Sequence, residues 1–322
     1  MRGIAQPRTL FPWLWLRRWQ CCLLALLFSA SLQATIVGDV RLALAENHLS
    51  DAEAALQRYH AANGITSEYL EALSWLGRAA LSAKQYDKAL ANAGEIRNQV
   101  IVLLKKRPLD ADKNLPIALG ASIEVTAQTL TAQGQRDQAV DLLRKELAAY
   151  KNTSIRARLQ KNLNLLTLEG KPAPALEAKE HLGPAVPSLS QLKGKPVILF
   201  FWAHWCPDCK QEAPLLARLQ QEMASKGLTI IGPTQRYGYI ANGTDAKPAE
   251  ELRYIEEVRR QFYGMLSAMP VPVSEETFKN YGASTTPTFV FIDAKGTVRL
   301  YHPGAMTYPE LLAAASNLLK IL

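Results

Sequence analysis

Residues 194–216 read GKPVILFFWAHWCPDCKQEAPLL, and this stretch decides the fold of the C-terminal half. Its first part, Pro196 to Trp202, is a continuous apolar run, which is typical of a strand buried on both faces. A C-x-x-C pair, Cys206 and Cys209, lies between this run and the start of a predicted helix. In that context a C-x-x-C pair favours redox chemistry.

The first cysteine of such a pair lies at a helix N-terminus, where unpaired N–H groups and the helix dipole lower the pKa of its thiol. We therefore expect Cys206 to be the nucleophile that attacks a partner disulfide. Cys209, one turn further along, is expected to resolve the mixed disulfide.

The cysteine count agrees with a redox role. The chain has four cysteines, and Cys21 and Cys22 fall in the first 34 residues. A disulfide between the remaining two closes a very short loop and adds little stability. Zinc or copper is the alternative, but a structural zinc site needs four ligands, and His204 is the only histidine near the pair. We expect no metal and no other cofactor.

Further elements follow on the C-terminal side. Predicted strands and helices alternate there, and a hairpin turns at residues 293–296. The order predicts an α/β domain with a central mixed sheet flanked by helices. The strands are expected at 228–231, 288–292 and 297–301, and the helices at 215–223, 250–266 and 309–319.

The N-terminal half reads differently, with apolar residues at three- and four-residue spacing from Gly38 to Leu168. A weak recurrence, with an alanine on the inner face, appears at 48–53, 85–90 and 135–140. It resembles tetratricopeptide-like repeats, which often bind a protein partner. The alternative is an all-helical domain without a groove. We expect an all-helical domain at 38–169, a proline-containing linker at 170–175 and the α/β domain at 176–322.

Residues 1–34 have the pattern of a secretory leader. Arg17 and Arg18 precede an apolar run from Cys21 to Leu32, which is short for a spanning helix. A cleaved signal peptide or an uncleaved membrane anchor would both place the protein in the periplasm or cell envelope. The formal charge is +8, but four arginines and no acidic residue lie in this leader. We therefore predict no nucleic-acid partner.

At this point the C-terminal half, from about Pro172 to Leu322, resembles the thioredoxin superfamily in its exported TlpA/ResA-like branch. Pro214 matches the proline that kinks the active-site helix, and Thr286-Pro287 matches the cis-proline loop. The resemblance implies that Trp205, Pro207, Thr286 and Pro287 contact a protein disulfide substrate. It also implies a membrane thiol donor. An ordinary strand-entry proline is the alternative for Pro287.

Two departures from the family stand out. Phe200 occupies the position of thioredoxin's buried aspartate, and neutral Gln235 stands where the resemblance implies a glutamate. The base that assists Cys209 is therefore not identified. Asp208, between the cysteines, disfavours a nearby thiolate and favours a reductase, whereas a protonated His204 would act in the opposite direction. Both could instead be solvated loop side chains.

The leading interpretation is an envelope thiol-disulfide reductase. An oxidase or isomerase of the same fold is the alternative within this chemistry. A peroxiredoxin-like antioxidant is disfavoured, because Leu199 and Ala203 replace the expected proline and threonine. The non-enzymatic alternative is a protein-binding module of helical repeats with a vestigial redox domain.

Overall fold

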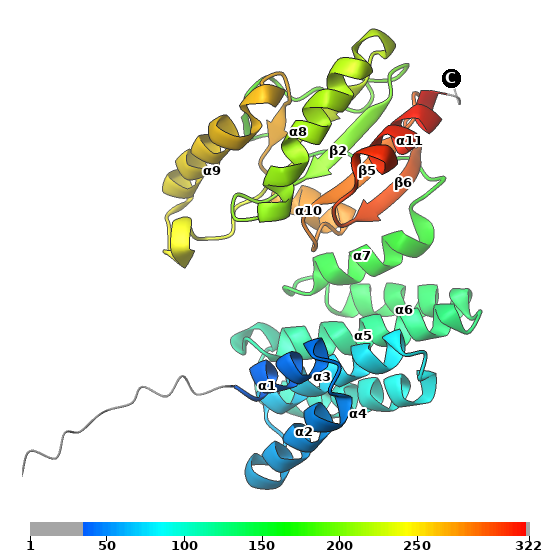
Figure 1. The fold of residues 1–322 in the computed structure, drawn as a ribbon, viewed down its shortest axis with the longest axis vertical. Coiled ribbons are helices and arrows are strands. Elements are labelled where there is room, and N and C mark those ends of the chain that lie inside the picture. Colours follow the sequence, from blue (N-terminus) through cyan, green and yellow to red (C-terminus); the bar gives the residue numbers. More distant parts are fainter. Residues whose placement is uncertain (1–34, 320–322) are drawn as a thin grey trace, which may run out of the picture. The chain divides into compact units, whose positions relative to one another are not determined.

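The computed structural model describes residues 35–319. The leader predicted at 1–34 lies outside these residues. Between residues 35 and 319, no helix is both long and apolar enough to cross a bilayer. Figure 1 shows an all-helical N-terminal half and an α/β C-terminal half.

The helical half confirms the expected helices and shows three equivalent turns. Asn47, Lys84 and Gly134 each adopt positive φ two residues before a helix begins. At each turn the next residue donates its N–H to the carbonyl five positions earlier, over 2.8 Å. The helices are α1 Ile36–Ala45, α2 Leu49–Asn63, α3 Ser67–Ser82, α4 Tyr86–Leu104, α5 Leu115–Ala132, α6 Arg136–Ala149 and α7 Arg156–Thr167.

The recurrence seen in the sequence has a packing reason. Ala52, Ala89 and Ala139 occupy the same place in α2, α4 and α6, and none has any exposed surface. A small residue there lets the second helix of each pair approach its neighbours closely. The helical half therefore repeats one helix–turn–helix unit, although its assignment to the tetratricopeptide type stays a prediction.

The α/β half is built on a four-stranded sheet of order β3-β2-β5-β6. Strand β2 pairs with β3 in parallel and with β5 antiparallel, and β5 and β6 form the predicted hairpin. The elements are β2 Val197–Phe201, α8 Pro207–Glu222, β3 Thr229–Ile231, α9 Pro248–Tyr263, β5 Thr288–Ile292, β6 Val298–Pro303 and α11 Tyr308–Leu319. This arrangement confirms the mixed sheet flanked by helices.

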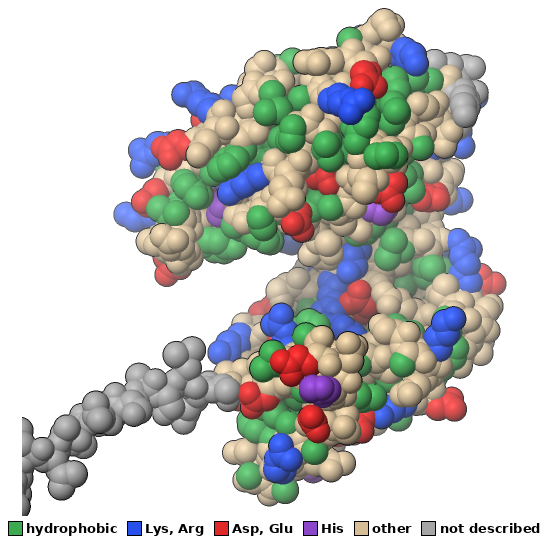
Figure 2. Space-filling model, viewed as in Figure 1, with side chains coloured by type: hydrophobic (Ala, Val, Ile, Leu, Met, Phe, Trp, Pro, Cys, Tyr) green, Lys and Arg blue, Asp and Glu red, His purple; other side chains and the backbone are tan. Residues whose placement is uncertain are grey.

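Both faces of the sheet are buried, as the unbroken apolar run of β2 predicted. Ile198 and Phe200 face a core closed by α8, α9 and α11. Val197, Leu199 and Phe201 face a second core, which α10 (Glu275–Tyr281) closes. Charged side chains of both signs are interspersed over the outer surface in Figure 2.

Three features were not anticipated. Helix α10 is one, and the short antiparallel pair β1 (His181–Leu182) and β4 (Val271–Pro272) is another. The third concerns the predicted linker at 170–175, which is hydrogen-bonded to the start of β6. Gly170 N–H donates to Val298 O over 2.8 Å, and Val298 N–H donates to Lys171 O over 2.9 Å. This segment therefore adds to the edge of the α/β half.

Helix α7 packs against α10 and joins the two halves. Arg156 forms a bidentate ion pair with Glu276, with N–O distances of 2.7 and 3.0 Å. The buried Asn164 side chain donates to Tyr281 O over 2.9 Å. Gly282 ends α10 with φ +63°, and a Cβ built there would lie 2.3 Å from Lys161 N of α7. Only glycine allows this close approach.

We expect Gly282→Ala to lower the free energy of unfolding by at least about 2 kcal/mol, because it adds a steric clash to the cost of a left-handed backbone. Gly296→Ala is the matched control, since Gly296 has φ +84° but nothing within 4 Å of its Cβ position. It should lose only about 1–2 kcal/mol. Urea unfolding of both variants measures the difference, and equal losses would contradict the close α7 contact.

Candidate active site

The C-x-x-C pair lies at the junction between the end of β2 and the start of α8. Cys206 is the N-cap residue of α8, and Pro207 occupies the first turn, where a missing N–H costs nothing. Cys209 N–H donates to Cys206 Sγ over 3.1 Å. The two sulfurs are joined in a disulfide. The predicted site at a helix N-terminus is therefore present, and Pro214 lies within the same helix.

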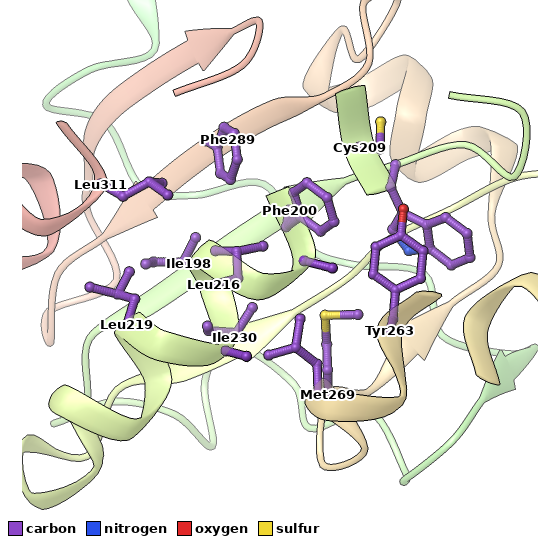
Figure 3. Packing of buried hydrophobic residues seen from close by; sticks show 14 of the residues in the cluster. Ile198, Phe200, Cys209, Leu216, Leu219, Ile230, Tyr263, Met269, Phe289 and Leu311 are labelled. Carbon is purple, nitrogen blue, oxygen red and sulfur yellow. The ribbon is translucent and has the colours of Figure 1, made fainter. Parts of the chain in front are cut away.

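The two cysteines differ little in exposure. Cys206 is 2% exposed and Cys209 is fully buried. Figure 3 shows Cys209 in the same packed cluster as Phe200, Leu216 and Tyr263. Trp205, next to Cys206, is 45% exposed, whereas Trp202 is buried and donates its ring N–H to Gly232 O. Trp205 therefore lies on the surface, where its contact with a substrate stays a prediction, and Trp202 lies in the core.

The predicted cis-proline loop lies directly against Cys206. The Thr286–Pro287 peptide bond is cis. Cys206 Sγ is 3.5 Å from the carbonyl oxygen of Thr286. Residues 80 positions apart are thus brought into contact.

Glu212 is a site residue that the sequence analysis missed. It follows Cys209 by three positions on α8, so the two side chains share the buried face of the helix. Glu212 Oε1 accepts the Met306 N–H over 2.8 Å, while Oε2 has no hydrogen-bond partner among the described residues. Burial raises the pKa of Glu212 to about 7, against the lowering effect of the Met306 N–H. The sequence did contain a signal for this residue, since Glu212 is a carboxylate on an otherwise apolar helix face.

Phe200 is fully buried in the core, so no carboxylate reaches Cys209 from β2. Gln235 and Glu250 are at least partly exposed, and Asp245 is exposed in the segment before α9. Glu251 is buried, but it is bound to His204 and to backbone N–H groups.

His204 is not a solvated loop side chain, whereas Asp208 is exposed. His204 is 1% exposed, and its Nε2 lies 3.3 Å from Glu251 Oε1. Burial lowers the pKa of His204 despite the opposing effect of Glu251. The protonated His204 considered as a redox-tuning group is therefore disfavoured. Within residues 35–319, no group of three or more His, Cys, Asp or Glu side chains could hold a metal ion.

The comparisons with known proteins concern the C-terminal half. The profile of the AhpC/TSA family matches residues 170–301. Thioredoxin-like protein YneN of Bacillus subtilis is 32% identical over 144 residues, which are 44% of this chain and 76% of YneN. Thiol-disulfide oxidoreductase ResA of Bacillus subtilis is 28% identical over 152 residues, 47% of this chain and 76% of ResA.

A crystal structure of a thioredoxin-family thiol:disulfide interchange protein from Chlorobium tepidum is 24% identical. The match covers 47% of this chain and 97% of that one, with a TM-score of 0.37. The likeness to YneN extends over most of that protein, and the C-x-x-C helix N-terminus beside a cis-proline agrees with it. Through its C-terminal half, the chain belongs to the thioredoxin-like family of thiol-disulfide oxidoreductases.

Proposed function

We propose that this protein is a cell-envelope reductase that reduces protein disulfides with Cys206 and Cys209. The observation that carries the proposal is the position of Cys206 Sγ. It accepts a backbone N–H at the start of α8 and lies beside the cis Thr286–Pro287 bond. A thiolate there is stabilised by the N-terminal N–H groups and dipole of the helix.

The reaction is a two-step exchange. The Cys206 thiolate attacks one sulfur of the client disulfide, which forms a mixed disulfide and releases the other client sulfur as a thiolate. The Cys209 thiolate then attacks Cys206 Sγ, and the bond between Cys206 and the client breaks. Two electrons and two protons end on the client, and the protein is left with the Cys206–Cys209 disulfide.

Glu212 accepts the proton of Cys209 in this scheme. It lies on the same buried helix face, and one of its oxygens has no other hydrogen-bond partner among the described residues. Its pKa of about 7 suits a group that must gain and lose a proton near neutral pH. Glu212 would thus do what the buried aspartate does in thioredoxin, a position that Phe200 occupies here.

Asp208 supports the reducing direction. Its carboxylate lies between the cysteines and opposes a thiolate nearby, so the reduced form is stabilised less than in strongly oxidising proteins. Trp205, Pro207, Thr286 and Pro287 surround Cys206 and are assigned to client binding. The repeated helical pairs are assigned to a protein partner.

The leader pattern at 1–34 and the similarity to ResA support an envelope location. A membrane thiol donor would then regenerate the dithiol, because each turnover leaves the protein oxidised.

Peroxide reduction is a second candidate, favoured by the AhpC/TSA match. Leu199 and Ala203 are both fully buried and offer no hydroxyl beside Cys206. Peroxide consumption no faster than that of Cys206→Ser would exclude this activity.

Cys209→Ser should trap client proteins as mixed disulfides, because the second attack cannot occur. Affinity purification followed by non-reducing electrophoresis detects the adducts, which dithiothreitol should release. Cys206→Ser is the matched control and should form none. Equal capture by both variants would instead assign client binding to the helical half alone.

Glu212→Gln should remove the rise in the rate of mixed-disulfide resolution that the wild type shows around pH 7. Glu212 accepts a proton only when ionised, above its pKa of about 7. At pH 8 we expect the variant to be slower by about tenfold or more. Stopped-flow measurement from pH 5.5 to 9 tests this. Glu222→Gln, an exposed change on the same helix, is the control and should keep the wild-type pH profile. A wild-type pH profile in Glu212→Gln would contradict the role of Glu212 as the proton acceptor.

The reduction potential of the Cys206–Cys209 couple should lie near or below about −270 mV. Asp208→Asn should move it to a less negative value, because the thiolate then loses a repulsive neighbour. Equilibration with glutathione or dithiothreitol buffers measures both. A wild-type value of about −120 to −180 mV would instead indicate an oxidase or isomerase.

A further inference from the structure

Trp205, the residue before Cys206, belongs to a row of three aromatic rings. Tyr237 comes from the segment between β3 and α9, and its ring meets Trp205 edge-on with centroids 5.5 Å apart. Tyr239 follows, with its ring centroid 6.2 Å from that of Tyr237. Trp205 is exposed, and both tyrosines are partly exposed. We call Trp205, Tyr237 and Tyr239 the aromatic lip.

The buried carboxylate of Glu251 binds the backbone of the aromatic lip. Its Oε1 accepts the Tyr237 N–H over 2.5 Å, and its Oε2 accepts the Gly238 N–H over 2.9 Å. The same carboxylate contacts His204, two positions before Cys206. Glu251 and His204 are each 1% exposed. One buried carboxylate thus ties the β3–α9 segment to the active-site loop.

The imidazole of His204 completes this support. The rings of Tyr237, Tyr239 and Tyr254 meet it nearly perpendicularly, with centroids 5.3 to 5.5 Å away. The segment also closes on itself, since Ala246 N–H donates to Gly238 O and Ile240 N–H donates to Thr244 O. The lip is therefore held in place before any client arrives, which reduces the entropy lost on binding.

Two cations near the lip along the chain are engaged elsewhere, whereas the acidic residues Asp208 and Asp245 are exposed. Arg236 pairs with Glu180 and donates to Pro248 O, and Lys210 lies over the Phe262 ring. Glu251 lies beneath the rings. The rings themselves offer aromatic faces and edges next to Trp205, which favour an aromatic or large aliphatic side chain.

We propose that the aromatic lip is a client-recognition surface for an aromatic or large aliphatic side chain next to the client's reactive cysteine, and that Glu251 is its positioning residue. The inference rests on the proposed function. A client sulfur bonded to Cys206 must place its neighbouring residues beside Trp205, because consecutive residues extend only about 3.3–3.6 Å each. The occupant of the lip is thus the segment that flanks the client cysteine.

The test uses two disulfide-bridged peptides that differ only in Phe or Ser next to one cysteine. The wild type should reduce the Phe peptide with a kcat/KM about five- to tenfold higher, mainly through KM. Tyr237→Ala should abolish this ratio. The ratio is the measure because a general loss of activity lowers both rates equally.

Glu251→Gln keeps the size of the side chain but leaves only one acceptor oxygen for the two backbone N–H groups. It should raise KM for the Phe peptide several-fold and change kcat less than twofold. Met265→Ala, which removes an exposed apolar side chain from the turn after α9, should keep the wild-type ratio.

The outcomes are distinct. A wild type that reduces both peptides equally, or a Tyr237→Ala protein that keeps the preference, would overturn the lip while leaving the reductase in place. A fall in kcat without a change in KM for Glu251→Gln would overturn its positioning role. A wild type that reduces neither peptide would overturn the reductase, and the lip with it.

Discussion

The hydrogen bond from Cys209 N–H to Cys206 Sγ fixes the first cysteine at the N-terminus of α8, and the rest of the site is arranged around that sulfur. It forms because β2 is an inner strand of the sheet and the chain passes from the end of β2 to the N-terminus of α8. A sulfur at that point faces unpaired N–H groups, whose partial positive charge favours the thiolate. The apolar residues of β2 matter for chemistry because they hold that junction rigid.

Burial has opposite consequences for the pKa values of two ionisable groups near the junction, Glu212 and His204, and a third group stays exposed. For Glu212 it raises the pKa to about 7 and leaves a carboxyl that can exchange a proton at neutral pH. For His204 it lowers the pKa, so that the ring acts as a neutral packing and hydrogen-bonding group. Asp208 stays exposed, and its carboxylate adds to the rise in the pKa of Glu212. One short stretch of chain thus holds three different electrostatic environments.

The helical half contacts the α/β half through packed side chains and not only through the connecting segment. Helix α7 shares an ion pair, a buried hydrogen bond and a glycine contact with α10. Helix α10 in turn closes the core on the sheet face opposite α8. The last helix of the repeated half therefore supports the redox half, and residues 170–175 extend that contact along β6.

Much of this protein was predictable from local patterns. The apolar run of β2, the three-residue spacing of Cys206 and Cys209 and the Thr286-Pro287 pair each act over a few residues, and the structure has all three as expected. The inner-face alanines of the helical half were readable for the same reason. Only the tertiary structure decided that Glu212 meets Met306, that Glu251 meets His204 and that residue 170 meets β6. These partners lie 47 to 128 positions apart or on different elements, so their burial and pKa shifts depend on how the sheet and helices close around them, which no local pattern encodes.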